Sequence, residues 1–116
     1  MEYSVTSLSK NTAVLKLKDN ITVYQLENLK DAIGELKKLK GCKNVIVDAS
    51  GIGYLDAFAL GIISSYSREL RDNGGDLKFI SLNEDLKRIF KMSQLVKVYE
   101  IYDNIEEAEE SFHKSG

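Results

Sequence analysis

A short apolar run, Val45–Val47, constrains the fold of this chain more than any other segment. Consecutive apolar residues without polar alternation are typical of a central strand that is buried on both faces. The run leads into Asp48, then into a glycine-containing loop, and then into Asp56, which stands in front of an apolar helical pattern. We expect Asp56 to cap that helix, because its side chain can accept hydrogen bonds from unpaired amides of the first turn. A buried strand that leads through a loop into a helix predicts a parallel α/β sheet.

Strand-like and helix-like segments alternate along the rest of the chain. Residues 3–8 and 13–18 alternate apolar and polar side chains and predict an antiparallel hairpin. Apolar residues spaced by three and four predict two helices, one with Leu26, Leu29, Ile33 and Leu36 inward after a capping box at Thr22–Gln25, the other with Ala59, Ile63, Tyr66 and Leu70 inward. Later strands are predicted at Leu77–Leu82 and Val96–Ile101, with a short helix between them and a last helix near the C-terminus.

This order predicts an α/β fold: a mixed β-sheet with an N-terminal hairpin and parallel strands, flanked by about four helices. A length of 116 residues fits one domain spanning residues 1–116. The net charge of −2 makes binding to nucleic acid or to an anionic membrane surface unexpected. No stretch approaches the roughly 20 apolar residues of a membrane span, and the N-terminus has no signal-peptide pattern, so we expect a cytoplasmic protein.

Catalytic, cofactor and metal motifs are weak in this sequence. The segment Gly51-Ile-Gly53 follows a strand, but a dinucleotide-binding loop needs a third small residue where Asp56 stands. A single cysteine, Cys42, and a single histidine, His113, do not predict a metal site. Asp48 and Asp56 are the one pair of carboxylates that could do acid–base chemistry, but we expect Asp48 to end a strand and Asp56 to cap a helix. We therefore expect no cofactor, no metal and no enzyme activity.

Four segments together resemble a known family. The first, here called the signature segment, is Asp56-Ala57-Phe58-Ala59-Leu60-Gly61. The others are Leu17–Ile21, a Gly-Gly turn and strand at Gly74–Ser81, and Leu86–Leu95 with its Leu-x-Arg-x-Phe and Met-x-x-Leu spacing. Their order resembles the STAS domain family, the bacterial anti-sigma factor antagonists, in which the signature segment reads Asp-Ser-Ser/Thr-Gly-Leu-Gly. Asp19 stands where that family usually has glycine.

The resemblance implies a non-enzymatic regulator of transcription. Members of the family bind an anti-sigma factor, often a kinase with a histidine-kinase-like ATPase fold, and thereby release a sigma factor. Phosphorylation of the first serine of the signature segment adds roughly −1.5 to −2 charges and breaks the complex. Ala57 occupies that position here and has no oxygen to accept phosphate. The usual switch is therefore expected to be absent. The surface expected to bind the partner is the loop and helix start, Ser50–Gly61, which contains the signature segment, with Leu17–Val23 adjacent to it.

Three questions about the site stay open at this stage. Phe58 is either an exposed anchor for the partner or a core residue that packs against the first helix. Ser50, Ser64 and Ser65 are substitute positions for phosphate, although Ser64 and Ser65 lie within the predicted helix and fit a polar helix surface better. The alternative function is a sensory or scaffold STAS module that binds a small ligand or a nucleotide.

Overall fold

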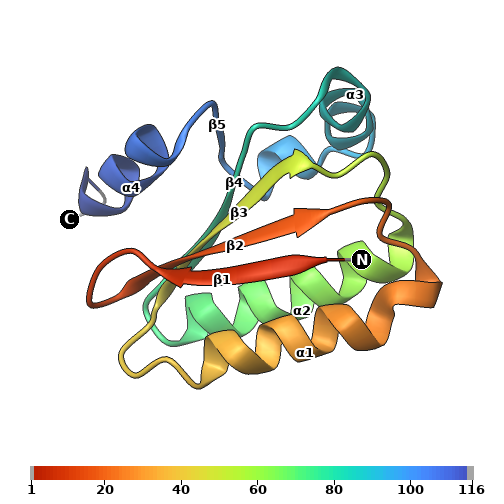
Figure 1. Ribbon diagram of the computed structural model, residues 1–116. Coiled ribbons are helices and arrows are strands. Elements are labelled where there is room, and N and C mark those ends of the chain that lie inside the picture. Colours follow the sequence, from red (N-terminus) through yellow and green to blue (C-terminus); the bar gives the residue numbers. More distant parts are fainter. Residues whose placement is uncertain (1, 115–116) are drawn as a thin grey trace.

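The computed structural model describes residues 2–114, which form a five-stranded sheet, four α-helices and two 3₁₀-helices (Figure 1). The strands are β1 (Tyr3–Ser7), β2 (Thr12–Lys18), β3 (Asn44–Gly51), β4 (Asp76–Ile80) and β5 (Ile101–Tyr102). The α-helices are α1 (Leu26–Lys37), α2 (Ala57–Asp72), α3 (Glu84–Met92) and α4 (Ile105–Lys114). The 3₁₀-helices are η1 (Val23–Gln25) and η2 (Leu95–Lys97). This architecture confirms the predicted α/β class with its mixed sheet.

The strands lie in the sheet in chain order, β1-β2-β3-β4-β5. β1 and β2 form the predicted antiparallel hairpin, and every later pair is parallel. β3 is the central strand, and Val45, Ile46 and Val47 are each 0% exposed. The apolar run is therefore buried on both faces, as its lack of alternation predicts.

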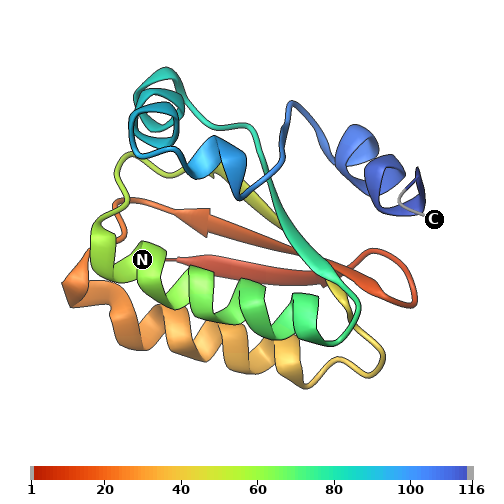
Figure 2. The ribbon, with the colours of Figure 1, turned by 180° about the vertical axis from the view of Figure 1, so that it is seen from behind.

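Helices cover the two faces of the sheet unequally. α1 and α2 lie side by side on one face, and α4 lies on the other (Figures 1 and 2). The predicted inward residues of α1 and α2 are buried, apart from half-buried Leu26. The main core also includes the ring cluster of Phe79, Phe90 and Tyr99, with Phe79 edge-on to both partners at centroid distances of 5.1 and 5.2 Å.

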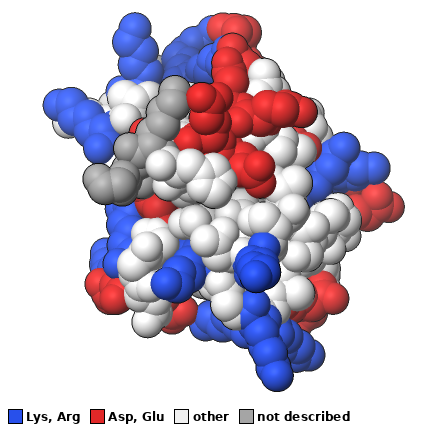
Figure 3. Space-filling model, turned by 90° about the vertical axis from the view of Figure 1, so that its left-hand side faces the viewer, with Lys and Arg blue, Asp and Glu red and all other residues white. Residues whose placement is uncertain are grey.

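The α4 face is held by a buried lysine as well as by apolar contacts. Lys78 on β4 is 3% exposed, and its Nζ lies 3.0 Å from Glu100 Oε2 and 2.8 Å from the Ser111 hydroxyl of α4. The hydrogen bond from Lys78 lowers the pKa of Glu100, which keeps that partner charged. The glutamates of α4 lie toward the outside, and Figure 3 shows acidic side chains gathered over this helix.

The strand predicted at Val96–Ile101 is wrong. Residues Leu95–Lys97 form η2, preceded by Gln94 in a left-handed conformation with φ of 60°, and β5 contains only Ile101 and Tyr102. The β-branched and aromatic residues of this segment, Val96, Val98, Tyr99 and Ile101, are typical of a strand. The turn instead brings the Tyr99 ring into the core, where it is 2% exposed against Phe79.

Within residues 2–114, none of the helices has both the length and the apolar character that crossing a bilayer requires.

Candidate functional site

Asp56 fixes the geometry of the site with both of its carboxylate oxygens. Oδ1 accepts a hydrogen bond from the Ala59 amide at 2.9 Å and caps α2, as the sequence predicts. Oδ2 accepts a second hydrogen bond, 2.8 Å long, from the Val23 amide at the start of η1. One side chain therefore ties the beginnings of two helical segments together. The second bond was not predicted, because the sequence does not reveal which distant amide a free carboxylate oxygen meets.

The backbone joins the same two segments. The Ile21 amide donates to the Tyr54 carbonyl at 2.8 Å, and the Asp56 amide donates to the Ile21 carbonyl at 3.0 Å. The chain reaches this point through Asp19, whose φ of 69° is a left-handed conformation that favours glycine and that aspartate tolerates better than most residues. Leu17–Val23 therefore lies beside Ser50–Gly61, as expected, with Lys18 and Asp19 next to Gly51 and Ile21–Val23 next to Tyr54–Asp56.

A capping box orients η1. The Thr22 amide donates to Gln25 Oε1 at 2.9 Å, and the Tyr24 amide donates to the Thr22 hydroxyl at 3.3 Å. The predicted box therefore exists, although it opens a 3₁₀ turn that leads into α1. Between the two box residues, Val23 is 44% exposed and Tyr24 is 90% exposed.

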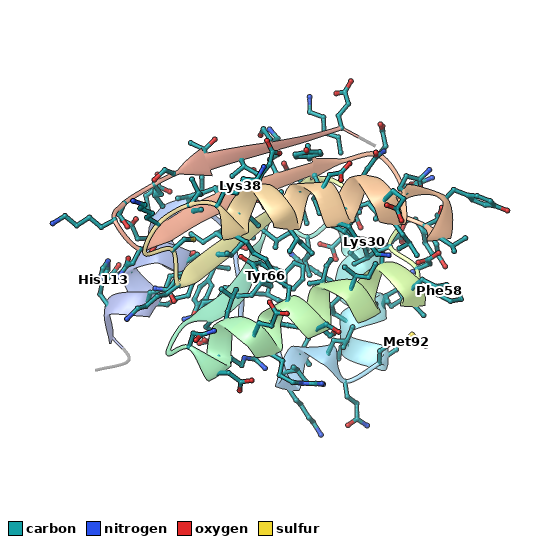
Figure 4. All side chains as sticks on the ribbon, turned by 90° about the horizontal axis from the view of Figure 1, so that it is seen from below. Lys30, Lys38, Phe58, Tyr66, Met92 and His113 are labelled. Carbon is teal, nitrogen blue, oxygen red and sulfur yellow. The ribbon has the colours of Figure 1, made fainter. Side chains whose placement is uncertain are left out.

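The signature segment consists of the cap and the first turn of α2, with Gly61 just beyond. Ala59 is buried, whereas Ala57 is exposed and the Phe58 side chain is 64% exposed. Phe58 points away from the core at the N-terminal end of α2 (Figure 4), so the core alternative for this residue is wrong. A ring of this size outside the core is a natural anchor for a binding partner.

Exposed apolar side chains gather where the two segments meet. We call the surface formed by Val23, Tyr24, Tyr54, Ala57 and Phe58 the apolar loop surface. Hydrogen bonds hold both segments that carry it, so its side chains project from an ordered backbone. Ordered apolar surface of this kind is typical of sites that bind another protein. Tyr54 lies within the predicted contact segment Ser50–Gly61, whereas Tyr24 lies just outside the adjacent segment Leu17–Val23 and was not predicted to take part.

The four positions considered for phosphate are in different surroundings. Ala57 presents an exposed methyl group at the start of α2, and Ser50 is exposed near the end of β3. Ser65 is exposed in the middle of α2, as expected of a polar helix surface. Ser64 is not part of that surface: it is half-buried, and its Oγ accepts a hydrogen bond from the Tyr99 hydroxyl at 2.7 Å.

The carboxylates do not form a catalytic pair in this arrangement. Asp48 lies inside β3 rather than at its end, and its Oδ1 accepts a hydrogen bond from the Ser50 amide at 3.0 Å. Asp56 uses both oxygens on backbone amides. Among residues 2–114 no cluster of three or more histidine, cysteine or acidic side chains is placed to hold a metal ion. Cys42 is half-buried, and burial raises the pKa of its thiol.

A family model described as the STAS domain matches residues 3–108 of the chain. Among curated relatives, a Thermotoga maritima protein provisionally named an anti-sigma factor antagonist is 29% identical over 75 residues. That alignment covers 65% of this chain and 66% of the relative, so the chain spans just under two thirds of that protein's length.

Solved structures share the fold. A crystal structure of a Thermotoga maritima protein, also provisionally named an anti-sigma factor antagonist, has a TM-score of 0.84 at 22% identity, with 96% of this chain and 94% of that chain covered. The unphosphorylated anti-sigma factor antagonist SpoIIAA has a TM-score of 0.72 at 14% identity, with 99% and 100% covered. SpoIIAA of Bacillus has also been solved in a phosphorylated form, with a TM-score of 0.71 at 16% identity and 95% and 97% covered.

Proposed function

Because the chain belongs to the STAS domain family, we propose that it is an anti-sigma factor antagonist that acts by binding. The chain binds an anti-sigma factor. The sigma factor that the anti-sigma factor would otherwise hold is thereby released. The observation that carries the proposal is the exposed Phe58 ring, presented within the signature segment by the two hydrogen bonds of Asp56. Relatives whose names state the same role support it.

The contact surface in this proposal is the signature segment together with the rest of the apolar loop surface. Phe58 enters a pocket of the partner, and Val23 and Tyr24 surround it. Apolar anchors of this kind dominate binding energy when the partner removes them from water. Because the backbone beneath them is already ordered by Asp56, little conformational entropy is lost on binding.

The partner that we propose is an anti-sigma factor with a histidine-kinase-like ATPase fold, as the family resemblance implies. Residues 1–116 act as one STAS unit in the cytoplasm, with no enzyme activity of their own. Ala57 places a methyl group where the family carries its phosphorylated serine. A phosphate there would add negative charge next to the Asp56 carboxylate and disrupt the contact, so its absence leaves the chain permanently able to bind.

The proposal is tested with the purified chain, the anti-sigma factor of the same organism and ATP. We expect a complex whose dissociation constant is the same with and without prior incubation in ATP, measured by titration calorimetry. Intact-mass spectrometry should show no added phosphate on the chain. The absence of a complex would contradict the proposed function. A phosphate mapped to Ser50, Ser64 or Ser65, with loss of binding, would show that a substitute switch exists.

A further inference from the structure

A groove with a volume of about 560 Å³ runs between α1 and α2, on the outer side of the helical layer. One end lies at Phe58 and Leu26, and the other at Tyr66 and Glu69. Figure 4 looks onto this side of the molecule and shows Lys30 and Tyr66 between the two helices, with Phe58 at the N-terminal end of α2. All of its lining residues belong to α1 or α2. Two helices therefore form the groove, and no third element within residues 2–114 covers it.

Two helical glycines, Gly34 of α1 and Gly61 of α2, line the groove. A Cβ atom added at either position would meet nothing within 4 Å. A glycine inside a helix costs about 1 kcal/mol relative to alanine, and no close contact with the described residues requires one at these two positions. What the glycines do provide is space, because each lets another backbone approach its helix closely.

The charges of the groove differ between its two ends. At the Tyr66 end, Lys37 Nζ lies 3.1 Å from Glu69 Oε2 across the groove, so that cation is paired with the opposite helix. Nearer Phe58, Lys30 pairs with Glu27 of its own helix, at 3.7 Å, and both side chains are more than half exposed. An exposed pair of this kind is weak, and Lys30 can exchange it for an acidic group of a partner.

We propose that this groove receives an amphipathic helix of the anti-sigma factor, an inference that rests on the proposed function. The apolar face of that helix packs on Ile33 and Ile62 beside the two glycines, and an acidic residue on its flank pairs with Lys30. The groove is continuous with the apolar loop surface, because Ala57 and Phe58 belong to both. A partner anchored on Phe58 is therefore at the entrance of the groove.

A helix fits the groove better than a small molecule does. Small-molecule sites usually enclose 70–90% or more of the ligand surface, whereas this groove lacks a covering element. A helix laid between two others supplies that third side, in the helix-in-groove manner of many protein complexes. The glycines allow the closer approach that an added side chain would prevent.

The test is the substitution Gly34→Leu, with Glu106→Leu on α4 as a control that adds the same side chain on the opposite face of the sheet. Gly34→Leu should leave the melting temperature unchanged or raised, since leucine is the better helix former and a Cβ atom at this position meets nothing within 4 Å. It should weaken binding to the anti-sigma factor by roughly tenfold or more, measured by calorimetry. Glu106→Leu should bind as the unmodified chain does.

A second variant keeps the inference testable if Gly34→Leu fails to fold. Lys30→Glu reverses an exposed charge and should lower the affinity by roughly threefold or more at low ionic strength, with a smaller loss at high salt. Lys10→Glu in the hairpin turn, which does not line the groove, is its control and should have no effect. Unchanged binding by Gly34→Leu, or by Lys30→Glu if Gly34→Leu does not fold, would overturn the inference.

The outcomes separate this inference from the proposed function. If Phe58→Ala loses binding while Gly34→Leu and Lys30→Glu retain it, the partner uses the apolar loop surface alone; the inference then fails and the proposed function stands. If the unmodified chain does not bind the anti-sigma factor, both fail. Decanoate serves as a probe for small apolar ligands. If it stabilises the unmodified chain but not Gly34→Leu, and Gly34→Leu still binds the anti-sigma factor, the groove is a small-molecule site. A partner helix in the groove is then excluded.

Discussion

Phe58→Ala should lower the affinity for the anti-sigma factor by about 30-fold or more while leaving the melting temperature unchanged. The ring is 64% exposed in the free chain, so its removal leaves no cavity in the core. In the complex the same ring fills a pocket of the partner, and truncating an aromatic anchor of this kind costs about 2 kcal/mol or more of binding free energy. Calorimetry of the variant against the same partner measures the loss.

The control for this variant is Leu8→Ala. Leu8 is also an exposed apolar residue, at 38%, but it lies next to the turn of the β1–β2 hairpin, at the other end of the molecule from the start of α2 (Figure 1). Leu8→Ala should bind with unchanged affinity, because it removes apolar surface that the partner does not cover. If Phe58→Ala binds the anti-sigma factor as tightly as the unmodified chain does, Phe58 is not an anchor of the complex.

Asp56→Ala should destabilise the chain by about 2–3 kcal/mol and weaken partner binding as well. The substitution leaves the Ala59 amide without its cap and the Val23 amide without its acceptor. A lost cap costs about 1 kcal/mol, and a lost hydrogen bond to a charged group costs about 1.5–3 kcal/mol, here toward the low end because Asp56 is only partly buried. Urea denaturation followed by circular dichroism measures the change in unfolding free energy.

Asp56→Asn separates the two roles of this side chain. Its remaining oxygen can still accept from the Ala59 amide, but its NH₂ group cannot accept from the Val23 amide. We therefore expect a loss of stability smaller than that of Asp56→Ala, combined with weakened binding, because η1 is no longer tied to α2. If Asp56→Ala unfolds at the same urea concentration as the unmodified chain, the two hydrogen bonds do not organise the site.

The parts of the fold that depend on apolar periodicity could be read from the sequence. Val45–Val47 is continuously apolar, which predicts the burial on both faces that the structure has. The spacing of Ala59, Ile63 and Tyr66 predicts that one side of α2 faces the sheet, and all three are buried. Residues 96–101 are an exception, since their β-branched and aromatic side chains favour a strand that does not form there. The Tyr99 ring instead packs against Phe79 in the core. Such a contact between distant residues cannot be predicted from the local sequence pattern.

Most residues of the candidate site could be predicted from the sequence, but the directions of their side chains could not. Asp56 was identifiable as a cap because it precedes a helical pattern, whereas its bond to Val23 depends on how two distant segments meet. The outward direction of Phe58 depends on where the helix begins. Because Ala59 faces the core, Phe58 is rotated by about 100° and lies on the same flank as Ile62, toward the groove.

The most direct test of the central claim measures the release of a fluorescently labelled sigma factor from its complex with the anti-sigma factor as the chain is added. Release should occur, and prior incubation of the chain with the anti-sigma factor and ATP should leave it undiminished, because Ala57 cannot accept phosphate. Ala57→Ser, which restores the hydroxyl, should release sigma factor without ATP and lose that ability with it. Failure of the unmodified chain to release sigma factor, or loss of release after incubation with ATP, would contradict the account.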